Sequence, residues 1–472
     1  MLSIQFGVRV DMSSIETLSR ALMQIIGEAD DIETEKSDKF IWETETGATV
    51  TLRGVFSPGY SFGSSVVKSV EIHAADNSLI MSAKDLKDYS SEDLFDDGDV
   101  EEVLEQIERG ATITGSRFND VLVGGDDDDI LMGAAGHDVL KGMGGNDELQ
   151  GGTGNDTYFI DGNTEINKNI SDPGIDTVKS SAGYSLGARQ ENIVLLGNGN
   201  INATGNSIGN KLYGTSGSNL IQGGGGNDRI EGGAGNDRLE GGAGNDLLIG
   251  GPGADLLSGA GGDDTYVIAK VTELNKGLSD PGVDLVRIPV AYTLGVQQEN
   301  LTLLGTWNIN GTGNAKANVL IGNNKNNVLS GSGGDDTLNG AGGADILNGG
   351  LGNDMLAGSG GNDIFLFNTA PGGSNVDTIM DFGGAGSTAL DLIRLDDAIY
   401  SALATGALAS SAFESAPGLT AAATTDGRII YDTDTGALYY DADGSGTGSV
   451  AIQFAVIGGN LSDLSAEDFV VA

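Results

Sequence analysis

Residues 232–240 read Gly-Gly-Ala-Gly-Asn-Asp-Arg-Leu-Glu, and variants of this nine-residue pattern recur through the middle of the chain. Eighteen copies share glycine at position one, Asp or Asn at position six and a large apolar residue at position eight. They lie in three blocks, 115–159, 205–267 and 313–366. Repetition at a short fixed period predicts a solenoid, in which each repeat buries its apolar side against its neighbours. We therefore predict a mainly β chain built around a parallel β-solenoid.

The repeat has the composition of a calcium site. Its last three residues suit a minimal strand, while glycine in the first six lets the backbone turn with φ > 0 and lets carbonyl oxygens converge. The Asp at position six adds a carboxylate, and Ca²⁺ takes about six to eight oxygen ligands of both kinds. Two repeats make one coil, so every second turn should stack, and each ion should bridge a pair such as Asp237 and Asp255.

The candidate metal ligands are therefore the position-six aspartates, which are Asp120, Asp129, Asp138, Asp147, Asp156, Asp228, Asp237, Asp246, Asp255, Asp264, Asp336, Asp345, Asp354 and Asp363. We expect full ligand sets between Asp138 and Asp156, across Asp228–Asp264 and across Asp336–Asp363. The first two repeats of blocks two and three should bind weakly or stay empty, because position six is Asn210, Asn219, Asn318 or Asn327. The alternative is a metal-free Gly/Asn-rich solenoid, which explains neither the constant Asp nor the net charge of −44.

Composition excludes several classes of partner. The 472 residues include 78 glycines and no cysteine, so disulfides and thiolate zinc sites are absent. The net charge of −44 opposes encounter with nucleic acid or an anionic membrane and favours cations. No apolar run is long enough to span a bilayer, and Met1–Asp11 lacks an apolar signal region. We expect no transmembrane segment and no cleavable signal peptide.

Two longer inserts separate the blocks and are copies of each other. Residues 170–178 (Ile-Ser-Asp-Pro-Gly-Ile-Asp-Thr-Val) match 278–286 (Leu-Ser-Asp-Pro-Gly-Val-Asp-Leu-Val), and Gln190-Glu191-Asn192 recurs as Gln298-Glu299-Asn300. The larger unit is thus a tandem duplication of about a hundred residues, as expected of a solenoid. Each block closes with an aromatic residue at position eight, as a capping coil should; these are Tyr158, Tyr266 and Phe365.

The flanks of the repeat region, 111–370, differ in pattern. Residues 1–110 predict a small α+β domain of unknown role, with helices at 13–26 and 100–108 and strands between Lys39 and Met81, including 48–52 and 66–72. Residues 371–472 predict a β-rich cap, with strands at 378–382 and 392–395 and a hairpin at 428–440.

Residues 114–472 resemble the RTX (repeats-in-toxin) family, whose nonapeptides match G-G-x-G-x-D-x-U-x. The resemblance implies a parallel β-roll that binds several calcium ions through the position-six carboxylate and the carbonyls of positions two and four. The implied carbonyl donors are Gly136, Gly145, Gly152, Gly154, Gly224, Gly226, Gly233, Gly235, Gly242, Gly244, Gly251, Gly253, Gly334, Gly343, Gly350, Gly352 and Gly361.

The last hundred residues resemble the tail that follows the roll in serralysin-type proteases, notably at 437–446 and in the final Asp468-Phe469-Val470-Val471. In those relatives the tail is an uncleaved signal for type I secretion. The resemblance implies a bacterial protein secreted to the extracellular space, with the type I secretion machinery as a partner. Residues 441–446 also resemble the start of an EF-hand loop, although the twelfth residue is Ile452 rather than Glu.

The main functional question is whether the chain also contains an enzyme domain. The only histidines are His73 and His137, so the His-Glu-x-x-His motif of the serralysin catalytic domain is absent. Residues 59–63 (Gly-Tyr-Ser-Phe-Gly) match a nucleophile elbow, but an α/β-hydrolase needs more chain, a helix after the Ser, and a downstream His and acid. A Gly/Ser turn is the simpler interpretation, and we assign no catalytic residue.

Our hypothesis is a non-enzymatic, calcium-dependent extracellular protein whose roll is a structural or binding module, in a matrix, adhesion or surface-layer role that could involve polysaccharide or a cell surface. The alternative is an extracellular enzyme, acting for example on polysaccharide, with an unrecognised N-terminal active site. A screen for carbohydrate binding and turnover with 1–110 deleted separates the two.

Overall fold

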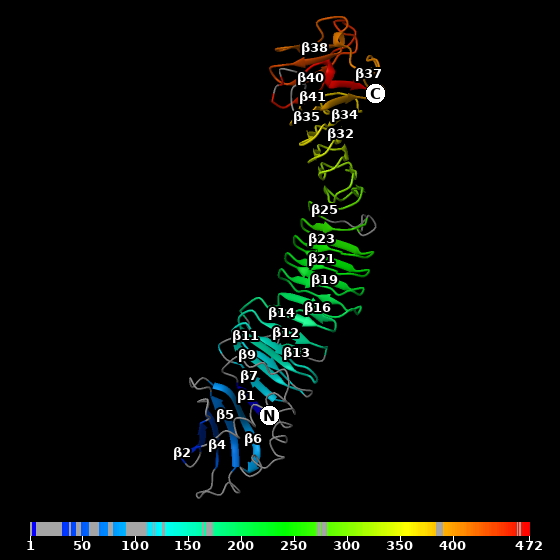
Figure 1. Ribbon diagram of the computed structural model, residues 1–472. Helices are drawn as coiled ribbons and strands as arrows, with labels where there is room; N and C mark the ends of the chain where they lie inside the picture. The colour runs from blue at the N-terminus through cyan, green and yellow to red at the C-terminus, as the bar shows by residue number, and fades with distance from the viewer. Residues whose placement is uncertain are drawn as a thin grey trace. The chain divides into compact units, whose positions relative to one another are not determined.

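The computed structural model describes residues 111–115, 117, 119–124, 128–162, 165–166, 173–270, 274, 281–383, 390–459, 461 and 464–472, together with the backbone of six strands between residues 2 and 90. The chain divides into two compact units, Met1–Ile230 and Glu231–Ala472, which are described separately (Figure 1). Strand β20 (Arg229–Glu231) contains the boundary. The described residues are almost all strands and turns, as predicted for a mainly β chain.

The position-eight residues decide where the strands form. All eighteen are at most 2 % exposed, and their flanking residues are more exposed, so each strand presents one apolar side chain to the interior. Each strand pairs in parallel with the strand two repeats later, with Leu131 opposite Leu149 and Leu329 opposite Leu347. Two nonapeptides therefore make one coil, as predicted.

The roll of the first unit has three parallel ladders. The first contains β7 (Ala111–Thr114), β9 (Ile130–Ala135), β11 (Glu148–Thr153) and β13 (Glu165–Ile166). The second contains β8 (Val121–Val123), β10 (Val139–Lys141), β12 (Thr157–Ile160), β14 (Thr177–Ser180), β16 (Asn192–Leu195) and β18 (Lys211–Tyr213). The third contains β15 (Tyr184–Ser185), β17 (Ala203–Thr204) and β19 (Leu220–Gly225).

An N-terminal antiparallel sheet continues the first of these ladders. It contains β2 (Asp31–Lys36), β3 (Lys39–Glu43), β4 (Thr49–Val55), β5 (Val66–His73) and β6 (Leu79–Ser90). Strand β1 (Leu2–Gln5) pairs antiparallel with β6 and parallel with β7, so it covers the open edge of the first coil (Figure 1). The strands predicted at 48–52 and 66–72 are confirmed, while the helices predicted at 13–26 and 100–108 lie outside the described residues.

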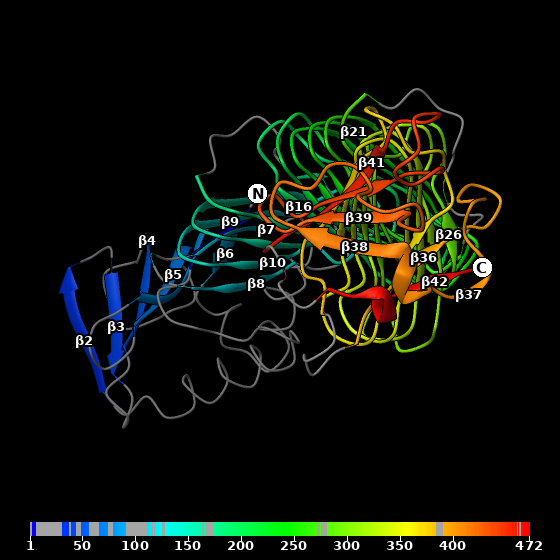
Figure 2. The ribbon, with the colours of Figure 1, turned by 90° about the horizontal axis from the view of Figure 1, so that it is seen from above.

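The second unit repeats this construction, and its coils overlay one another when viewed from above (Figure 2). One ladder joins β22 (Leu247–Ile249), β24 (Thr265–Val267), β25 (Leu285–Ile288), β27 (Asn300–Leu303), β29 (Val319–Ile321), β31 (Thr337–Asn339), β33 (Met355–Ala357) and β35 (Asp377–Ile379). The opposite side has β21 (Arg238–Ala243) and β23 (Leu256–Gly261), and then β26 (Tyr292–Thr293), β28 (Gly311–Thr312), β30 (Val328–Gly333), β32 (Ile346–Leu351), β34 (Ile364–Phe367) and β36 (Leu392–Leu395).

The described parts of the inserts are coils of the roll and not loops outside it. Strands β14 and β16 of the first insert pair in parallel with β12 and β18, and β25 and β27 of the second pair with β24 and β29. Val178 and Val286, at matching positions of the two copies, are fully buried. The inserts do not show the nine-residue pattern because their turns differ in length from those of the nonapeptides, although the coil continues through them.

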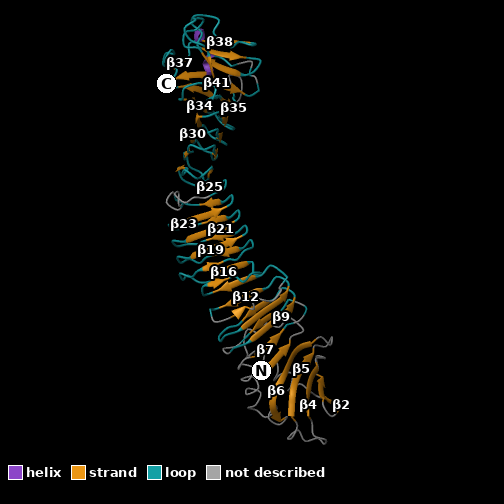
Figure 3. Cartoon of the chain, turned by 180° about the vertical axis from the view of Figure 1, so that it is seen from behind, coloured by secondary structure: helices purple, strands orange, loops and turns teal. Residues whose placement is uncertain are grey.

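The C-terminal region closes the second unit with short strands between longer loops (Figure 3). Strands β39 (Ile429–Asp432) and β40 (Ala437–Tyr440) form the predicted hairpin, and the predicted strand at 392–395 is β36. Strand β41 (Ile452–Ile457) pairs with β40 and β35, and β42 (Phe469–Val471) pairs with β36. The remaining elements are β37 (Gly406–Ala407), β38 (Phe413–Ala416) and the 3-10 helices η2 (Ser410–Ala412) and η3 (Ala466–Asp468).

Candidate metal centre

The turn of the repeat is built from left-handed backbone at positions two and four. All of the glycines predicted to donate carbonyls, except Gly253, have positive φ. Position two keeps this conformation even without glycine, as at Ser332 (φ 79°) and Ala341 (φ 72°). A Cβ added to Gly350 would lie 2.5 Å from the carbonyl oxygen of Ser332, two repeats earlier. The position-two carbonyl of Ser332 therefore points at the next turn of the stack.

Position one requires glycine for a different reason. Gly250 does not have positive φ, but a Cβ there would lie 2.6 Å from Oδ2 of Asp255 and would overlap the carboxylate. Other position-one glycines, such as Gly133 and Gly349, also face the Asp of their own repeat. Close approach of the carboxylate, rather than backbone conformation, thus excludes any side chain at this position.

The position-six aspartates form a buried ladder along the stacked turns. All fourteen candidates are between 1 and 3 % exposed. In each unit, Oδ1 of one Asp accepts a hydrogen bond from the backbone N–H of the position-six residue two repeats earlier. The pairs in the first unit are Asp120 with Asp138, Asp129 with Asp147, Asp138 with Asp156 and Asn210 with Asp228. Those in the second are Asp237 with Asp255, Asp246 with Asp264, Asn318 with Asp336, Asn327 with Asp345, Asp336 with Asp354 and Asp345 with Asp363.

The second carboxylate oxygen is available for a metal ion. Oδ2 of Asp255, Asp336, Asp345 and Asp354 is buried and has no hydrogen-bond partner among the described residues. Burial raises the pKa of Asp336 and Asp345 to about 7, with a further contribution from the neighbouring carboxylates Asp354 and Asp363. A buried carboxylate oxygen without a partner is costly unless a cation compensates it, so the residues present fit calcium.

Backbone oxygens would have to complete any coordination shell. Among the described residues, no group of three or more His, Asp or Glu side chains converges on one point. The ladder instead offers one carboxylate from each of two stacked turns, and the carbonyls of positions two and four are the ligands expected to complete the shell. Mixed carboxylate and carbonyl ligation is the chemistry that Ca²⁺ prefers.

A second ladder, at position five, was not predicted from the sequence. The side chain of position five accepts a hydrogen bond from the backbone N–H two repeats later, as Asp335 does from Asn353 (2.8 Å). This second ladder is exposed. Its hydrogen bonds run from the later turn to the earlier one, opposite to those of the buried ladder, so a position-five and a position-six side chain both join each turn to the next. His137 belongs to it, because its Nδ1 accepts the N–H of Asn155 (2.8 Å). The recurrence of Asn, Asp or His at position five was the available signal.

In the turns with Asn at position six, the Asn side chain forms its hydrogen bonds with protein backbone. Oδ1 of Asn318 accepts the N–H of Asn314 within its own turn (2.7 Å), and its Nδ2 donates to the carbonyl of Glu299 (2.9 Å). Asn327 forms the equivalent bond with Asn323 (2.8 Å), and neither Asn314 nor Asn323 has positive φ. An amide at position six carries no negative charge to attract a cation, and weak or empty binding at these turns stays a prediction.

The buried ladder continues beyond the nonapeptides. Oδ1 of an acidic residue in the inserts or the cap accepts the N–H of an Asp in one of the last two repeats of a block; these pairs are Asp156 with Asp176, Asp264 with Asp284, Asp354 with Asp377 and Asp363 with Asp391. Spacings of 20, 23 and 28 residues hid them from a search at period nine.

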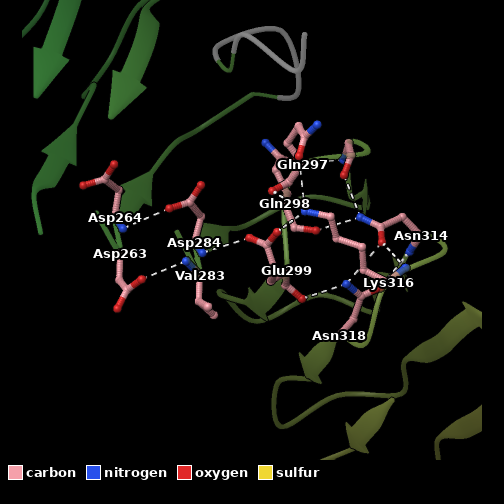
Figure 4. Close-up of polar contacts among 11 residues, drawn as sticks. Asp263, Asp264, Val283, Asp284, Gln297, Gln298, Glu299, Asn314, Lys316 and Asn318 are labelled. Atoms are coloured by element: carbon pink, nitrogen blue, oxygen red, sulfur yellow. Dashed lines mark hydrogen bonds and ion pairs between the residues drawn. The ribbon is translucent and has the colours of Figure 1, made fainter. Parts of the chain in front are cut away.

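In the second insert the ladder ends at a lysine (Figure 4). Asp264 donates its N–H to Asp284 (3.0 Å), and Asp284 donates its N–H to Oε2 of Glu299 (3.0 Å). The other oxygen of Glu299 forms an ion pair with the ammonium of Lys316. The acidic residues of this column thus end at a cation in the first turn of block three, beyond which the roll continues.

The aromatic residues that close the blocks also bind turn backbone. The hydroxyls of Tyr158 and Tyr266 accept the N–H of Gly151 and Gly259 (both 2.9 Å). Phe365 has no hydroxyl, and Oδ1 of Asp381 accepts the corresponding N–H of Gly358 instead (3.0 Å). The closing position therefore has a polar role that the sequence pattern alone did not indicate.

The remaining candidates stay outside this site. The Gly59–Gly63 motif lies outside the described residues, as does the side chain of His73. In the EF-hand-like segment, Oδ2 of Asp443 accepts the N–H of Gly448 (2.7 Å), so this carboxylate already holds its own loop together. No helix in the described part of the chain combines the length and apolar character needed to cross a membrane.

Comparison with known proteins agrees with the geometry. The family model described as the RTX calcium-binding nonapeptide repeat (four copies) matches residues 110–140, 133–162, 204–239, 232–266, 312–347 and 340–367. These segments are the three blocks of the roll. No curated protein matches the chain.

Proposed function

The chain is an RTX calcium-binding repeat protein, and from this we propose that it is a secreted protein whose roll folds on extracellular calcium and then serves as a structural or binding module. The position-six carboxylates and the carbonyls of positions two and four are the proposed ligands, with each ion between turns two repeats apart. A matrix, adhesion or surface-layer role is the proposed setting.

The buried carboxylate ladder is the observation that supports this proposal most strongly. Asp336 and Asp354 lie on consecutive turns, each has a buried Oδ2 with no hydrogen-bond partner among the described residues, and repulsion between them contributes to the raised pKa of Asp336. Without a cation, folding must bury these charges or protonate them. With calcium, the same groups become ligands, so the binding free energy adds to the folding free energy.

The C-terminal segment supports export before folding. Phe469 and Val471, in the segment that resembles a type I secretion signal, are each 1 % exposed and lie in β42. A secretion apparatus cannot reach these side chains in the folded protein. We propose that the chain stays unfolded inside the cell, where free calcium is low, and is exported in that state. It then folds outside, where calcium reaches millimolar levels.

Far-UV circular dichroism of the full chain with and without chelator tests the folding step. The proposal expects the β signal of the roll to be lost in chelator and restored by millimolar calcium. A β signal that is the same in both conditions contradicts it.

Export is tested separately by deletion. Removing Asp468–Ala472 should retain the protein in the cell, whereas removing 1–100 should not. Normal export of the C-terminal deletion would contradict the proposed secretion route while leaving calcium-dependent folding intact.

The module role is tested by binding and turnover assays with extracellular polysaccharide and with intact cells, on the full chain and on a form lacking 1–110. Calcium-dependent binding without turnover supports the module. Turnover that disappears with 1–110 would show an N-terminal enzyme instead.

A further inference from the structure

The loop between β40 and β41, in the cap, contains a buried acidic side chain that the roll does not use. Asp441 follows β40 directly and is 3 % exposed. Its Oδ1 is buried and has no hydrogen-bond partner among the described residues, while its Oδ2 accepts a long hydrogen bond from the N–H of Ala422 (3.4 Å). A buried carboxylate oxygen without a partner is costly unless a cation or a proton compensates it.

A second carboxylate lies beside Asp441. Oδ2 of Asp443 accepts the N–H groups of Gly448 (2.7 Å) and Ser449 (3.2 Å), so this side chain is held in place by its own loop. The Ser449 hydroxyl and the N–H of Gly448 hold the pKa of Asp443 below its ordinary value, and a side-chain contact with Asp441 also lowers it. Two carboxylates that approach each other repel unless a proton or a metal ion lies between them.

Backbone oxygens of a neighbouring loop approach the same segment. Gly444 has positive φ (65°), and a Cβ added there would lie 2.6 Å from the carbonyl oxygen of Thr425 and 2.9 Å from that of Thr424. The N–H of Ser445 donates to the Thr424 carbonyl (2.8 Å), which holds the two loops together. Carboxylate and carbonyl oxygens thus lie close to each other where the two loops meet, and Ca²⁺ prefers such a mixed set of oxygens.

The spacing of the loop offers further oxygens. An EF-hand loop binds Ca²⁺ through positions one, three, five, seven and nine of twelve, and it has Gly at position six. Counted from Asp441 as position one, the residues at positions three, five, six, seven and nine are Asp443, Ser445, Gly446, Thr447 and Ser449. Position twelve is Ile452 instead of the bidentate Glu, so binding should be weak, with a Kd of about 0.1–1 mM as in other extracellular modules.

The one positive side chain of this region is engaged elsewhere. Arg428 is the only Lys or Arg in residues 401–472. Its Nη1 donates to the carbonyl oxygens of Thr425 (2.7 Å) and Gly427 (2.8 Å), and no ion pair joins it to Asp441 in the described part of the chain. The protein therefore supplies no ion pair to compensate the buried oxygen of Asp441.

We propose that Asp441 and Asp443, with oxygens of the two loops around them, form a calcium site in the cap that is separate from the roll. The proposal goes beyond the proposed function, because this site lies outside the nonapeptides and requires no stacked turns. Its ion compensates the buried carboxylate of Asp441 and joins the β40–β41 loop to the loop that contains Thr424. Calcium outside the cell thus orders the cap as well as the roll.

Hydrogen exchange of the full chain at increasing free calcium tests the site. Peptides covering 420–428 and 439–450 should gain protection with calcium, and Asp441→Asn should raise their calcium midpoint by about tenfold or more, because it removes one of two carboxylates. Peptides covering β31 and β33 report on the roll and should keep their midpoint. An unchanged midpoint of the cap peptides in Asp441→Asn would overturn the proposal, and so would an equal shift of the roll peptides.

The same variant in chelator separates a metal site from a purely structural role of the carboxylate. Asp441→Asn replaces a buried charge by a neutral amide whose oxygen can still accept the N–H of Ala422. Without calcium, the cap peptides of the variant should therefore be protected as well as those of the unchanged chain, or better. Lower protection in chelator would show that a protein contact, for example with Arg428, already stabilises the carboxylate, and would overturn the proposal.

Asp397→Asn is the matched control, because it removes the same charge from an exposed position of the cap. It should shift neither the cap peptides nor the roll peptides. A shift of the cap peptides equal to that in Asp441→Asn would show that net charge, and not ligation, is responsible. If the roll peptides show no dependence on calcium, the proposed function fails while the cap site stands, so the two failures are distinguishable.

Discussion

Adjacent aspartates of one turn give a direct test of the buried ladder. Asp336 is 1 % exposed and faces the interior, whereas Asp335 belongs to the exposed ladder and accepts the N–H of Asn353. Substitution of either by Asn removes one negative charge and keeps an oxygen that can accept the ladder hydrogen bond. The two variants therefore differ in whether the lost carboxylate oxygen faces a metal site.

The expected effects differ in size. Asp336→Asn takes one of two carboxylates from the site shared with Asp354, for which we expect at least a tenfold loss of affinity, or about 1.4 kcal/mol. Asp335→Asn is a surface substitution that should change stability by less than about 0.5 kcal/mol. In chelator neither variant should be destabilised, because no ion is present to lose.

Calcium titrations by calorimetry, with unfolding followed by circular dichroism, measure both effects. The account expects fewer ions and a higher calcium midpoint for Asp336→Asn alone. Equal losses in the two variants would show that net charge, rather than ligation inside the stack, controls calcium binding.

Three further outcomes are expected. Burial raises the pKa of Asp345 to about 7. The calcium-free roll therefore takes up protons on folding, and its stability falls as the pH rises from the unfolded pKa of about 4 through the folded pKa of about 7. Circular dichroism in chelator should show more β structure at pH 5 than at pH 8, and the reverse order would refute this. In Gly331→Ala the added Cβ should overlap the position-six carboxylate of its own repeat and lower the free energy of unfolding by about 1–3 kcal/mol. In Gly333→Ala the nearest atom to the added Cβ is 3.7 Å away, so this variant should be tolerated. Thermal unfolding in calcium compares the two variants, and equal stability would contradict the steric argument. Tyr266→Phe leaves the N–H of Gly259 without its acceptor and should cost about 1 kcal/mol in the same assay; an unchanged melting temperature would show that the bond contributes nothing.

The parts of the fold that depend on local spacing could be predicted from the sequence. Position eight is a large apolar residue in every repeat, so burial of residues such as Leu239 and stacking of every second repeat followed from the period. Stacking of the position-six residues on every second turn also followed from the period, but burial of their side chains was not predicted. The pairing of Asp237 with Asp255 confirms this geometry, while the ligand role of the two side chains stays a prediction.

The parts that depend on non-local pairing could not be predicted. The insert coils contain Asp176 and Asp284 at irregular spacing, so nothing in a nine-residue period places them on the ladder. The sequence analysis assigned no role to Asn at position five, whose side chain accepts a backbone N–H of the next coil, as Asn326 does from Ala344. Pairing of β1 with β7 joins segments that are far apart in the sequence, and no local signal indicates such a partner.

Anomalous scattering from calcium, in crystals of the full chain grown with the ion, tests the central claim most directly. The account predicts ions between carboxylates of turns two repeats apart, for example between Asp336 and Asp354, with Oδ2 of each Asp directed at the ion. The turns of Asn318 and Asn327 should show much weaker density or none. Ions held within single turns, or a fully folded roll without ions, would contradict the account.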